Sequence, residues 1–256
     1  MNPIVKCVRG ALIGTIAAGA FATAWAEEGA HHWTYKGTTG PTHWAKLEDD
    51  FATCQLGKHQ SPIDIRKSAV RKADLAPIEF NYKPSALKII DNGHTIQVNY
   101  EPGSTITVGG QTYELVQFHF HKPSEEKIDG KSFDMVAHLV HKNAEGKLAV
   151  VAVLIRNGQA NPLIHTLWRN LPTEKGVERA AEGVNIDVST LLPPKRSYYT
   201  FAGSLTTPPC SEEVTWLVLR NPVHLSGEQI ARFGKIYPMN ARPTQPLNGR
   251  VVEASR

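Results

Sequence analysis

The sequence of 256 residues carries 28 lysine and arginine residues against 24 aspartate and glutamate residues, which gives a formal net charge of +4 at pH 7. This length fits one large domain. No run of lysine and arginine marks a nucleic-acid-binding surface, and after residue 26 no hydrophobic stretch is long enough to span a membrane. Composition therefore argues against a nucleic-acid partner and against a membrane span in the mature chain.

Residues 1–26 have the pattern of a secretory signal peptide. Lys6 and Arg9 give a basic start, an uncharged apolar segment follows, and the sequence AWA at 24–26 offers small residues where signal peptidase reads. The alternative, a membrane anchor, is disfavoured because the apolar segment is short and no basic stop-transfer cluster follows it. Cleavage removes two cations and lowers the formal charge from +4 to +2. We expect the mature domain, 27–256, to be periplasmic or secreted.

The cysteine residues agree with export. Cys7 lies within the expected signal peptide, so cleavage leaves Cys54 and Cys210 as an even pair in an oxidising compartment. The alternative is that they are two unrelated buried thiols. In a secreted chain, the even pair favours a Cys54–Cys210 disulfide.

The mature sequence contains more strand patterns than helical patterns. Alternating polar and apolar residues, short apolar runs and the turns between them predict β-strands. The predicted strands are 94–100, 104–108, 111–121, 133–141, 148–155 and 216–219, of which 148–155 is buried on both faces. Two short helices are expected at 161–170 and 226–233, where Ser226 can cap the second. There is no repeat or linker, so the sequence predicts one mainly β (α+β) domain built on a large sheet.

The segment 117–121, QFHFH, carries the most chemical information. Side chains alternate between the two faces of a strand, so Gln117, His119 and His121 project to one side and the two phenylalanines project to the other. His138 lies on the next predicted strand, which can pair antiparallel beside the first. Three neutral imidazoles with one open position form a catalytic zinc site. The alternative is an ordinary half-exposed sheet with chance histidine pairs, and these residues alone leave both interpretations open.

Seven short segments together decide between these interpretations. They occur at 32–35 (HWTY), 60–65 (QSPIDI), 91–94 (DNGH), 117–125 (QFHFHKPSE), 137–141 (AHLVH), 203–209 (GSLTTPP) and 240–247 (NARPTQPL). Each segment could occur by chance, but their combination and order closely resemble the α-class carbonic anhydrases, specifically the exported bacterial type. The likeness runs from about residue 32 to residue 252.

The resemblance implies a fold, an activity and a cofactor. The fold would be a central, twisted, mostly antiparallel sheet with short peripheral helices, and cis peptide bonds would precede Pro62 and Pro209. The activity would be the reversible hydration of carbon dioxide to bicarbonate and a proton by attack of a zinc-bound hydroxide, with a weak esterase side activity. The cofactor would be Zn²⁺, held by His119, His121 and His138. Sulfonamide and anion inhibitors are expected, and homodimer formation is left open.

Further site residues follow from the same resemblance, position by position. Thr206 would accept a hydrogen bond from the hydroxide and donate its own proton to Glu125, because an ionised carboxylate can only accept. His94 would carry protons between the metal site and solvent, which suits an imidazole with a pKa of about 6.5. The residues that would order the connecting waters and support the ligands are Tyr35, Asn92, Gln97, Gln117 and Asn240. The residues that would line an apolar carbon dioxide pocket are Val140, Val150, Leu205, Thr207, Val214 and Trp216, although such residues are also common in ordinary cores.

The chain departs from the family pattern beside His138. The family typically has a glutamate at position 136, but this chain has Val136, whose side chain accepts no hydrogen bond. Either water or another group provides an acceptor for the outer N–H of His138, or that ring is held less firmly. We therefore expect that Val136→Glu would slow zinc loss to a chelator. Glu126 stands where many family members have histidine, and the sequence assigns it no role.

Two other classes of function fit parts of the sequence. A relative that keeps the fold as a binding module would usually lack a zinc-binding histidine, whereas this chain retains all three together with Thr206 and Glu125. A zinc hydrolase acting on esters would use the same metal centre beside an apolar pocket. Metal content, together with relative efficiencies on carbon dioxide and an aryl ester, discriminates between these alternatives.

Overall fold

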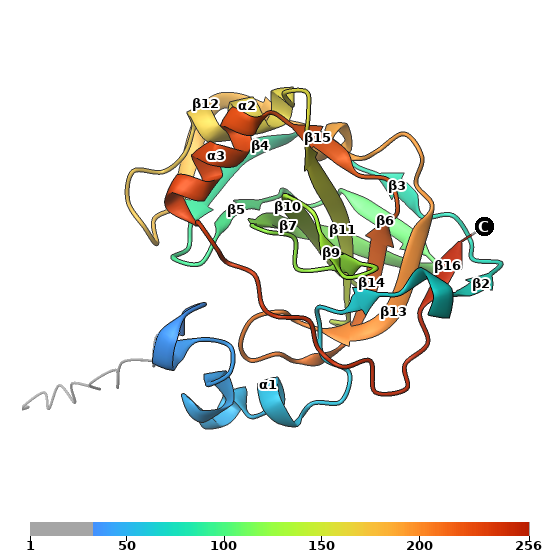
Figure 1. The fold of residues 1–256 in the computed structure, drawn as a ribbon. Coiled ribbons are helices and arrows are strands. Elements are labelled where there is room, and N and C mark those ends of the chain that lie inside the picture. The colour runs from blue at the N-terminus through green and yellow to red at the C-terminus, as the bar shows by residue number, and fades with distance from the viewer. Residues whose placement is uncertain (1–32, 256) are drawn as a thin grey trace, which may run out of the picture. The chain divides into compact units, whose positions relative to one another are not determined.

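The computed structural model describes residues 33–255 of the chain (Figure 1). These residues belong to one compact unit. Within them, no helix is long and apolar enough to cross a membrane. The expected signal peptide, 1–26, which includes Cys7, lies outside the described residues.

A large twisted sheet of 13 strands dominates the fold. In chain order its strands are β2 (Arg71–Ala73), β3 (Glu79–Asn81), β4 (Ser85–Asp91), β5 (Ile96–Asn99), β6 (Thr105–Val108), β7 (Gln111–His121), β10 (Met135–Lys142), β11 (Leu148–Asn157), β12 (Arg179–Ile186), β13 (Tyr198–Ser204), β14 (Glu212–Leu219), β15 (Val223–Leu225) and β16 (Glu253–Ser255). Across the sheet, neighbours follow the order β12, β4, β5, β7, β10, β11, β14, β13, β16 and β2. β15 also pairs with β11, β6 with β7, and β3 with β6.

Most neighbouring strands run antiparallel, as expected. Within the large sheet, the parallel pairs are β11 with β14, β11 with β15, and β16 with β2. β10 lies between β7 and β11 and is antiparallel to both. This pairing places His138 of β10 directly opposite His119 of β7, which confirms the predicted neighbourhood of these two strands.

The central strands are buried on both faces of the sheet. On β10, Met135 and Leu139 pack into the larger hydrophobic cluster, whereas Val136 and Val140 belong to a second cluster on the other face. β11 and β14 divide their side chains between the same two clusters. Because side chains alternate along a strand, His138 shares the face of Val136 and Val140. The histidine cluster is therefore built on the face that carries the second, smaller core.

Short elements surround the large sheet. A small sheet contains β1 (Asp64–Ile65), β8 (Lys127–Ile128) and β9 (Lys131–Ser132). The α-helices are α1 (Thr53–Leu56), α2 (Pro162–Arg169) and α3 (Gly227–Ile236), and 3-10 helices span Gly37–Thr39, Trp44–Lys46, Asp49–Phe51, Lys67–Ala69 and Val188–Leu191. α2 and α3 lie beside each other near β4 and β12 (Figure 1), where their buried side chains join the larger hydrophobic cluster.

Both predicted helices are present, and each begins with a side-chain cap. Asn161 precedes α2, and its side-chain oxygen accepts a hydrogen bond from the backbone N–H of Ile164. Ser226 precedes α3 and forms a capping box with Gln229, in which each side chain accepts a hydrogen bond from the other residue's backbone N–H. Such reciprocal bonds satisfy backbone donors that a helix start otherwise leaves unpaired.

A disulfide joins α1 to the loop between β13 and β14. It links Cys54 and Cys210, which are separated by 156 positions in the sequence, and confirms the predicted pair. Cis peptide bonds precede Pro62 and Pro209, as the family resemblance implies, and a third precedes Pro123.

Candidate metal centre

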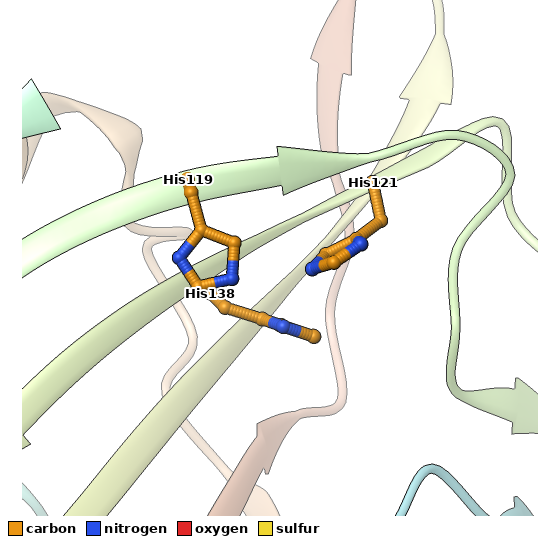
Figure 2. Close-up of side chains that lie close together, drawn as sticks. All are labelled: His119, His121 and His138. Carbon is orange, nitrogen blue, oxygen red and sulfur yellow. The ribbon is translucent and has the colours of Figure 1, made fainter. Parts of the chain in front are cut away.

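Three histidine side chains converge on one face of the large sheet (Figure 2). His119 and His121 come from the end of β7, and His138 comes from the neighbouring strand β10. His138 lies opposite His119, while Val136 lies opposite His121. One ring nitrogen from each histidine lies within 4.8 Å of the other two. The alternation of side chains on two paired strands thus brings three imidazoles together on the same side.

The first two rings are each held through the nitrogen that faces away from the centre. Nδ1 of His119 lies 2.8 Å from Oε1 of Gln117, two residues earlier on the same face of β7. Nδ1 of His121 lies 2.7 Å from the backbone carbonyl oxygen of Asn240. Because both partners are oxygen acceptors, Nδ1 donates in each ring. The lone pair of Nε2 is therefore left for a partner at the centre.

Glu126 provides the partner for the third ring. Its two carboxylate oxygens lie 3.0 and 3.3 Å from Nε2 of His138, and both side chains are buried. The sequence left three explanations open for the apolar Val136: a water molecule, another acceptor group, or a loosely held His138. The structure shows another acceptor group, which comes from the loop after β7. The nitrogen of His138 that remains for the centre is Nδ1.

The three inner nitrogens fit a metal ion. Nε2 of His121 is buried and has no hydrogen-bond partner within the described part of the chain. A buried polar atom without a partner costs free energy, and a bound cation would satisfy this lone pair. Imidazole nitrogen is a preferred ligand for zinc, copper, iron and nickel. The donor set is therefore suited to a metal of this group.

Electrostatics keep two of the three rings neutral. Burial, followed by the neighbouring charge of His138, lowers the pKa of His119 to about 3. The same two causes, with a further contribution from His119, lower the pKa of His121 well below its usual value. Burial also lowers the pKa of His138, but the charge and hydrogen bond of Glu126 and the charge of Glu125 raise it overall. Because metal ligands must be deprotonated, a metal competes with a proton chiefly at His138.

Comparisons with known proteins identify the family. The model of the eukaryotic-type carbonic anhydrase family matches residues 39–256. The carbonic anhydrase of Pectobacterium carotovorum is 47% identical over 223 residues, which cover 86% of this chain and 90% of that protein. The carbonic anhydrase of Nostoc sp. is 42% identical over 224 residues, which cover 86% of this chain and 85% of that protein. The chain belongs to the α-class carbonic anhydrase family.

A solved structure shows the same relationship in three dimensions. The α-carbonic anhydrase of Thermovibrio ammonificans, determined in complex with the inhibitor sulfanilamide, matches with a TM-score of 0.85 and 43% sequence identity. The match covers 88% of this chain and 100% of that one. The carbonic anhydrase fold therefore accounts for nearly all of the described residues.

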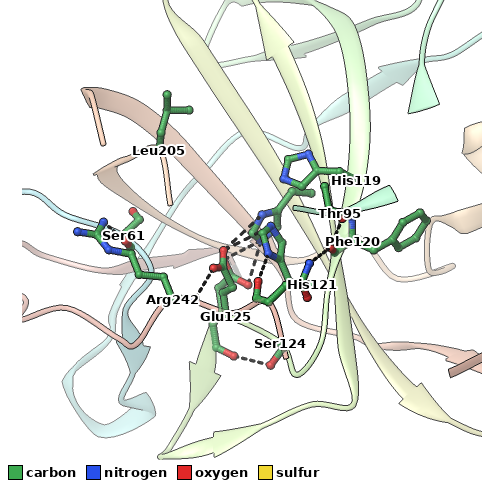
Figure 3. A network of polar contacts seen from close by, with 12 residues as sticks. Ser61, Thr95, His119, Phe120, His121, Ser124, Glu125, Leu205 and Arg242 are labelled. Atoms are coloured by element: carbon green, nitrogen blue, oxygen red, sulfur yellow. Dashed lines mark hydrogen bonds and ion pairs between the residues drawn. The ribbon is translucent and has the colours of Figure 1, made fainter. Parts of the chain in front are cut away.

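In this carbonic anhydrase, Glu125 lies fully buried between the histidine rings and Arg242 (Figure 3). Its Oε1 accepts a hydrogen bond of 2.7 Å from the backbone N–H of Arg242, and its Oε2 lies 3.6 Å from Nε2 of His121. Burial, followed by the charge of Glu126, raises the pKa of Glu125 to about 7, against the lowering effects of the His138 charge, the backbone N–H of Arg242 and the nearby Thr206 side chain. The structure thus brings Glu125 and Thr206 together beside the metal centre.

Four of the expected pocket residues lie on strands of the large sheet, and the other two lie in the loop after β13. Val140 of β10 is paired with Val150 of β11, which is paired in turn with Trp216 of β14. This row of paired residues across the sheet lies two positions along the strands from the row that contains His119 and His138. The ring of Trp216 lies 4.9 Å from the ring of His138. Val150, Val214 and Trp216 belong to the smaller core cluster, and Val140 and Leu205 pack against it. Thr207 is partly buried in the loop after β13, where its carbonyl oxygen accepts a hydrogen bond from Cys210.

His94 lies just before β5 and is tied to the metal centre through the backbone. Its ring stacks on Trp33, with centroids 3.6 Å apart and planes 7° apart. Its backbone N–H donates to Oδ1 of Asn92, and its carbonyl oxygen accepts from Nδ2 of Asn240. Since the carbonyl of Asn240 also holds His121, one buried asparagine connects the segment of His94 to a metal-site ring.

Tyr35 and Gln97 complete the polar surroundings named from the sequence. Burial, and then the charge of Glu125, raises the pKa of Tyr35 well above its usual value, so this hydroxyl lies within electrostatic reach of that carboxylate. Gln97 lies opposite His119 across β5 and β7 and accepts a hydrogen bond from Nδ2 of Asn92.

Two residues near the centre have no role assigned from the sequence: Glu126, which contacts His138, and Arg242, which contacts Glu125. The guanidinium of Arg242 donates to Oε1 of Gln60 and to two backbone carbonyls, one of them that of Cys54, while its backbone holds Glu125. Burial lowers the pKa of Arg242 to about 10. The missing acceptor at position 136 signalled that another group must serve His138, but spacing alone does not show which loop residue reaches it.

Proposed function

We propose that this carbonic anhydrase binds Zn²⁺ through His119, His121 and His138 and catalyses the reversible hydration of carbon dioxide to bicarbonate and a proton. The observation that carries the proposal is the convergence of three inner ring nitrogens, one of them buried without a partner among the described residues. Three neutral imidazoles that leave a fourth position open are the donor set of catalytic zinc sites. Family membership supports the reaction.

A bound zinc ion supplies Lewis-acid activation, and in carbonic anhydrases it lowers the pKa of the bound water to about 7. Glu125 and Thr206 would orient the attacking oxygen. An ionised Glu125 can only accept hydrogen bonds, so the Thr206 hydroxyl must donate to it and keeps its own lone pair for the hydrogen of the nucleophile. A lone pair of the nucleophile is then free to face the carbon of the substrate.

The apolar row beside the histidines would receive carbon dioxide. Val140, Val150 and Trp216 offer no charge and no strong hydrogen-bond partner to the substrate, which suits a small molecule without net charge. Leu205, Thr207 and Val214 would complete this recess. The product bicarbonate is charged and gains little from apolar walls, so the same surface favours its release.

His94 would carry the proton that the reaction releases. An imidazole can accept a proton from the site through one ring nitrogen and pass it to buffer. Hydrogen bonds from the His94 backbone to Asn92 and Asn240 hold this residue in place. We propose that the proton travels to it along a path lined by Tyr35 and Gln97.

The exported location and the inhibitor class also belong to the proposal. The Cys54–Cys210 disulfide supports a periplasmic or secreted protein, since such bonds persist in oxidising compartments. The relative from Thermovibrio ammonificans was solved with sulfanilamide, a sulfonamide, so we expect sulfonamides and small anions to inhibit this chain.

Metal analysis combined with stopped-flow hydration of carbon dioxide tests the proposal. Wild type should hold one zinc ion per chain, and His119→Ala should lose at least about 100-fold in kcat/KM, because Lewis-acid activation contributes several kcal/mol to the transition state. His165→Ala, which removes an exposed imidazole from α2, should leave both quantities unchanged.

Two outcomes would favour the other classes of function. Folded wild type that binds no zinc and hydrates no carbon dioxide would indicate a binding module. Higher efficiency on an aryl ester than on carbon dioxide would indicate a hydrolase, whereas weak ester cleavage that disappears in His119→Ala agrees with the proposal.

A further inference from the structure

Glu126 is a buried carboxylate, and within residues 33–255 its side chain forms hydrogen bonds and an ion pair with one metal-site ring. Its side chain is 0% exposed, and its two oxygens lie 3.0 and 3.3 Å from Nε2 of His138. Burying a carboxylate costs free energy unless a hydrogen-bond donor or a cation compensates it. Nε2 of His138 lies within hydrogen-bond distance of both oxygens and so compensates the buried carboxylate of Glu126.

The contact also determines which nitrogen of His138 can bind a metal. An ionised carboxylate only accepts hydrogen bonds, so the proton of the neutral ring must sit on Nε2. The lone pair is then on Nδ1, which lies 3.9 Å from Oε2 of Glu125 and is the nitrogen left for a metal. We propose that Glu126 is a positioning residue that fixes this tautomer and orientation of His138, replacing from the loop the acceptor that strand position 136 lacks. This inference rests on the zinc site proposed above.

The backbone around Glu126 is held firmly enough for such a role. The hydroxyl of Ser124 donates to the carbonyl oxygen of Glu126 at 2.7 Å and accepts from the backbone N–H of Phe133 at 2.8 Å. On the other side, Lys127 begins β8, which pairs with β1. Hydrogen bonds on both sides therefore fix the point from which the carboxylate reaches His138.

Position 136 explains why the carboxylate comes from the loop. Val136 is two residues before His138 on the same face of β10, so a longer acceptor there would reach the same ring. Instead it is fully buried in the smaller core cluster with Ile63 and Ile65. A glutamate added at 136 while Glu126 remains would place two like charges beside one ring, and like charges in a buried site repel. On this inference Val136→Glu alone would speed zinc loss, whereas the family pattern predicts slower loss, and the chelator experiment below decides between the two.

The first test measures the rate at which a chelator removes zinc from the loaded protein. Loss of such an acceptor costs on the order of 10- to 100-fold in metal affinity or activity, so Glu126→Ala should release zinc about that much faster than wild type. Glu126→Gln, which keeps an oxygen acceptor without the charge, should fall between them. Glu145→Gln makes the same chemical change at an exposed turn and should match wild type.

Moving the carboxylate back to the strand provides a rescue. The double variant Glu126→Ala/Val136→Glu should recover most of the zinc retention that Glu126→Ala loses, while Val136→Glu alone should release zinc faster than wild type. A merely structural role for Glu126 predicts no rescue, because the loop side chain is still missing. Failure of the double variant to improve on Glu126→Ala would overturn the inference.

A nuclear magnetic resonance measurement reads the tautomer directly. With ¹⁵N-labelled histidine and bound zinc, His138 of wild type should show a proton on Nε2 that is protected from exchange with water, and Glu126→Gln should shift this signal. A proton on Nδ1 would overturn the inference. If wild type bound no zinc, the proposed function would fail. If wild type bound zinc and Glu126→Ala released it at the wild-type rate, only the role of Glu126 would fail.

Discussion

At the residue scale, each histidine of the metal centre divides its two ring nitrogens between the protein and the centre. The acceptors of the outer nitrogens are an amide oxygen for His119, a carbonyl oxygen for His121 and a carboxylate for His138. A charged acceptor draws the N–H more strongly and makes the opposite nitrogen more basic. His138 should therefore be the strongest donor of the three, and the one most sensitive to changes around it.

Replacement of His94 tests the proposed route for protons. His94→Ala should lower kcat for carbon dioxide hydration by about 10-fold or more in dilute buffer, because a positioned acid–base group is lost. The ratio kcat/KM should stay near the wild-type value, since the proton leaves after the substrate has reacted. Stopped-flow assays at several buffer concentrations measure both quantities.

Added imidazole provides the control for this prediction. At high concentration it should restore kcat in His94→Ala, because it replaces the missing carrier from solution. Equal kcat for wild type and the variant in dilute buffer would show that protons leave by another path.

At the element scale, β10 combines the metal site with the core. His138 lies on one of its faces, whereas His141, three residues later, is fully buried away from the metal-site rings. Nδ1 of His141 donates to the carbonyl oxygen of Ala149, and Nε2 accepts from the hydroxyl of Tyr82. The ring is thus satisfied as a neutral group, and burial lowers its pKa to about 4.

The neutral state of His141 should make stability depend on pH. Between the unfolded pKa of about 6.5 and the folded pKa of about 4, the unfolded chain binds more protons than the folded chain. The free energy of unfolding should therefore fall by about 3 kcal/mol as pH drops through this window. In His141→Gln this contribution is absent, so denaturant titrations from pH 7 to pH 4 should show a shallower loss. Parallel curves for the two proteins would contradict this assignment.

Much of the sheet could be predicted at this scale because strand periodicity is a local property. The segment 111–121 coincides with β7, and 148–155 gives nearly all of β11. Alternation marks the first segment, an uninterrupted apolar run marks the second, and a turn containing glycine precedes each. The parallel pairing of β11 with β14 was not predicted, because partners far apart in sequence leave no local pattern. Glu126 was missed for the same reason: its contact with His138 depends on how a loop folds back over the sheet.

At the scale of the whole molecule, the N-terminal segment is fastened to the catalytic loops by one disulfide and one arginine. Cys210 follows the segment of Thr206 and Thr207, and Cys54 lies in α1. The guanidinium of Arg242 donates to the carbonyl oxygen of Cys54, while its backbone N–H holds Glu125. Distant parts of the chain are therefore linked to Glu125 through Arg242.

Removing the disulfide should weaken both stability and activity. The bridge closes a loop of 156 positions, and the chain-entropy model gives such a loop roughly 5 kcal/mol as an upper figure. The variant Cys54→Ser/Cys210→Ser should lose up to that much free energy of unfolding in denaturant titrations, and kcat/KM should fall because the Thr206 loop is less well held. Reductant should destabilise wild type but leave the variant unchanged. A wild type whose melting point and activity are unaffected by complete reduction would contradict this role.

Anomalous X-ray diffraction at the zinc absorption edge, on crystals of the zinc-loaded protein, tests the central claim most directly. We predict one strong peak at about 2.0–2.1 Å from Nε2 of His119, Nε2 of His121 and Nδ1 of His138. A crystal of folded protein with no peak among these three rings, or with zinc bound to Nε2 of His138, would contradict the account.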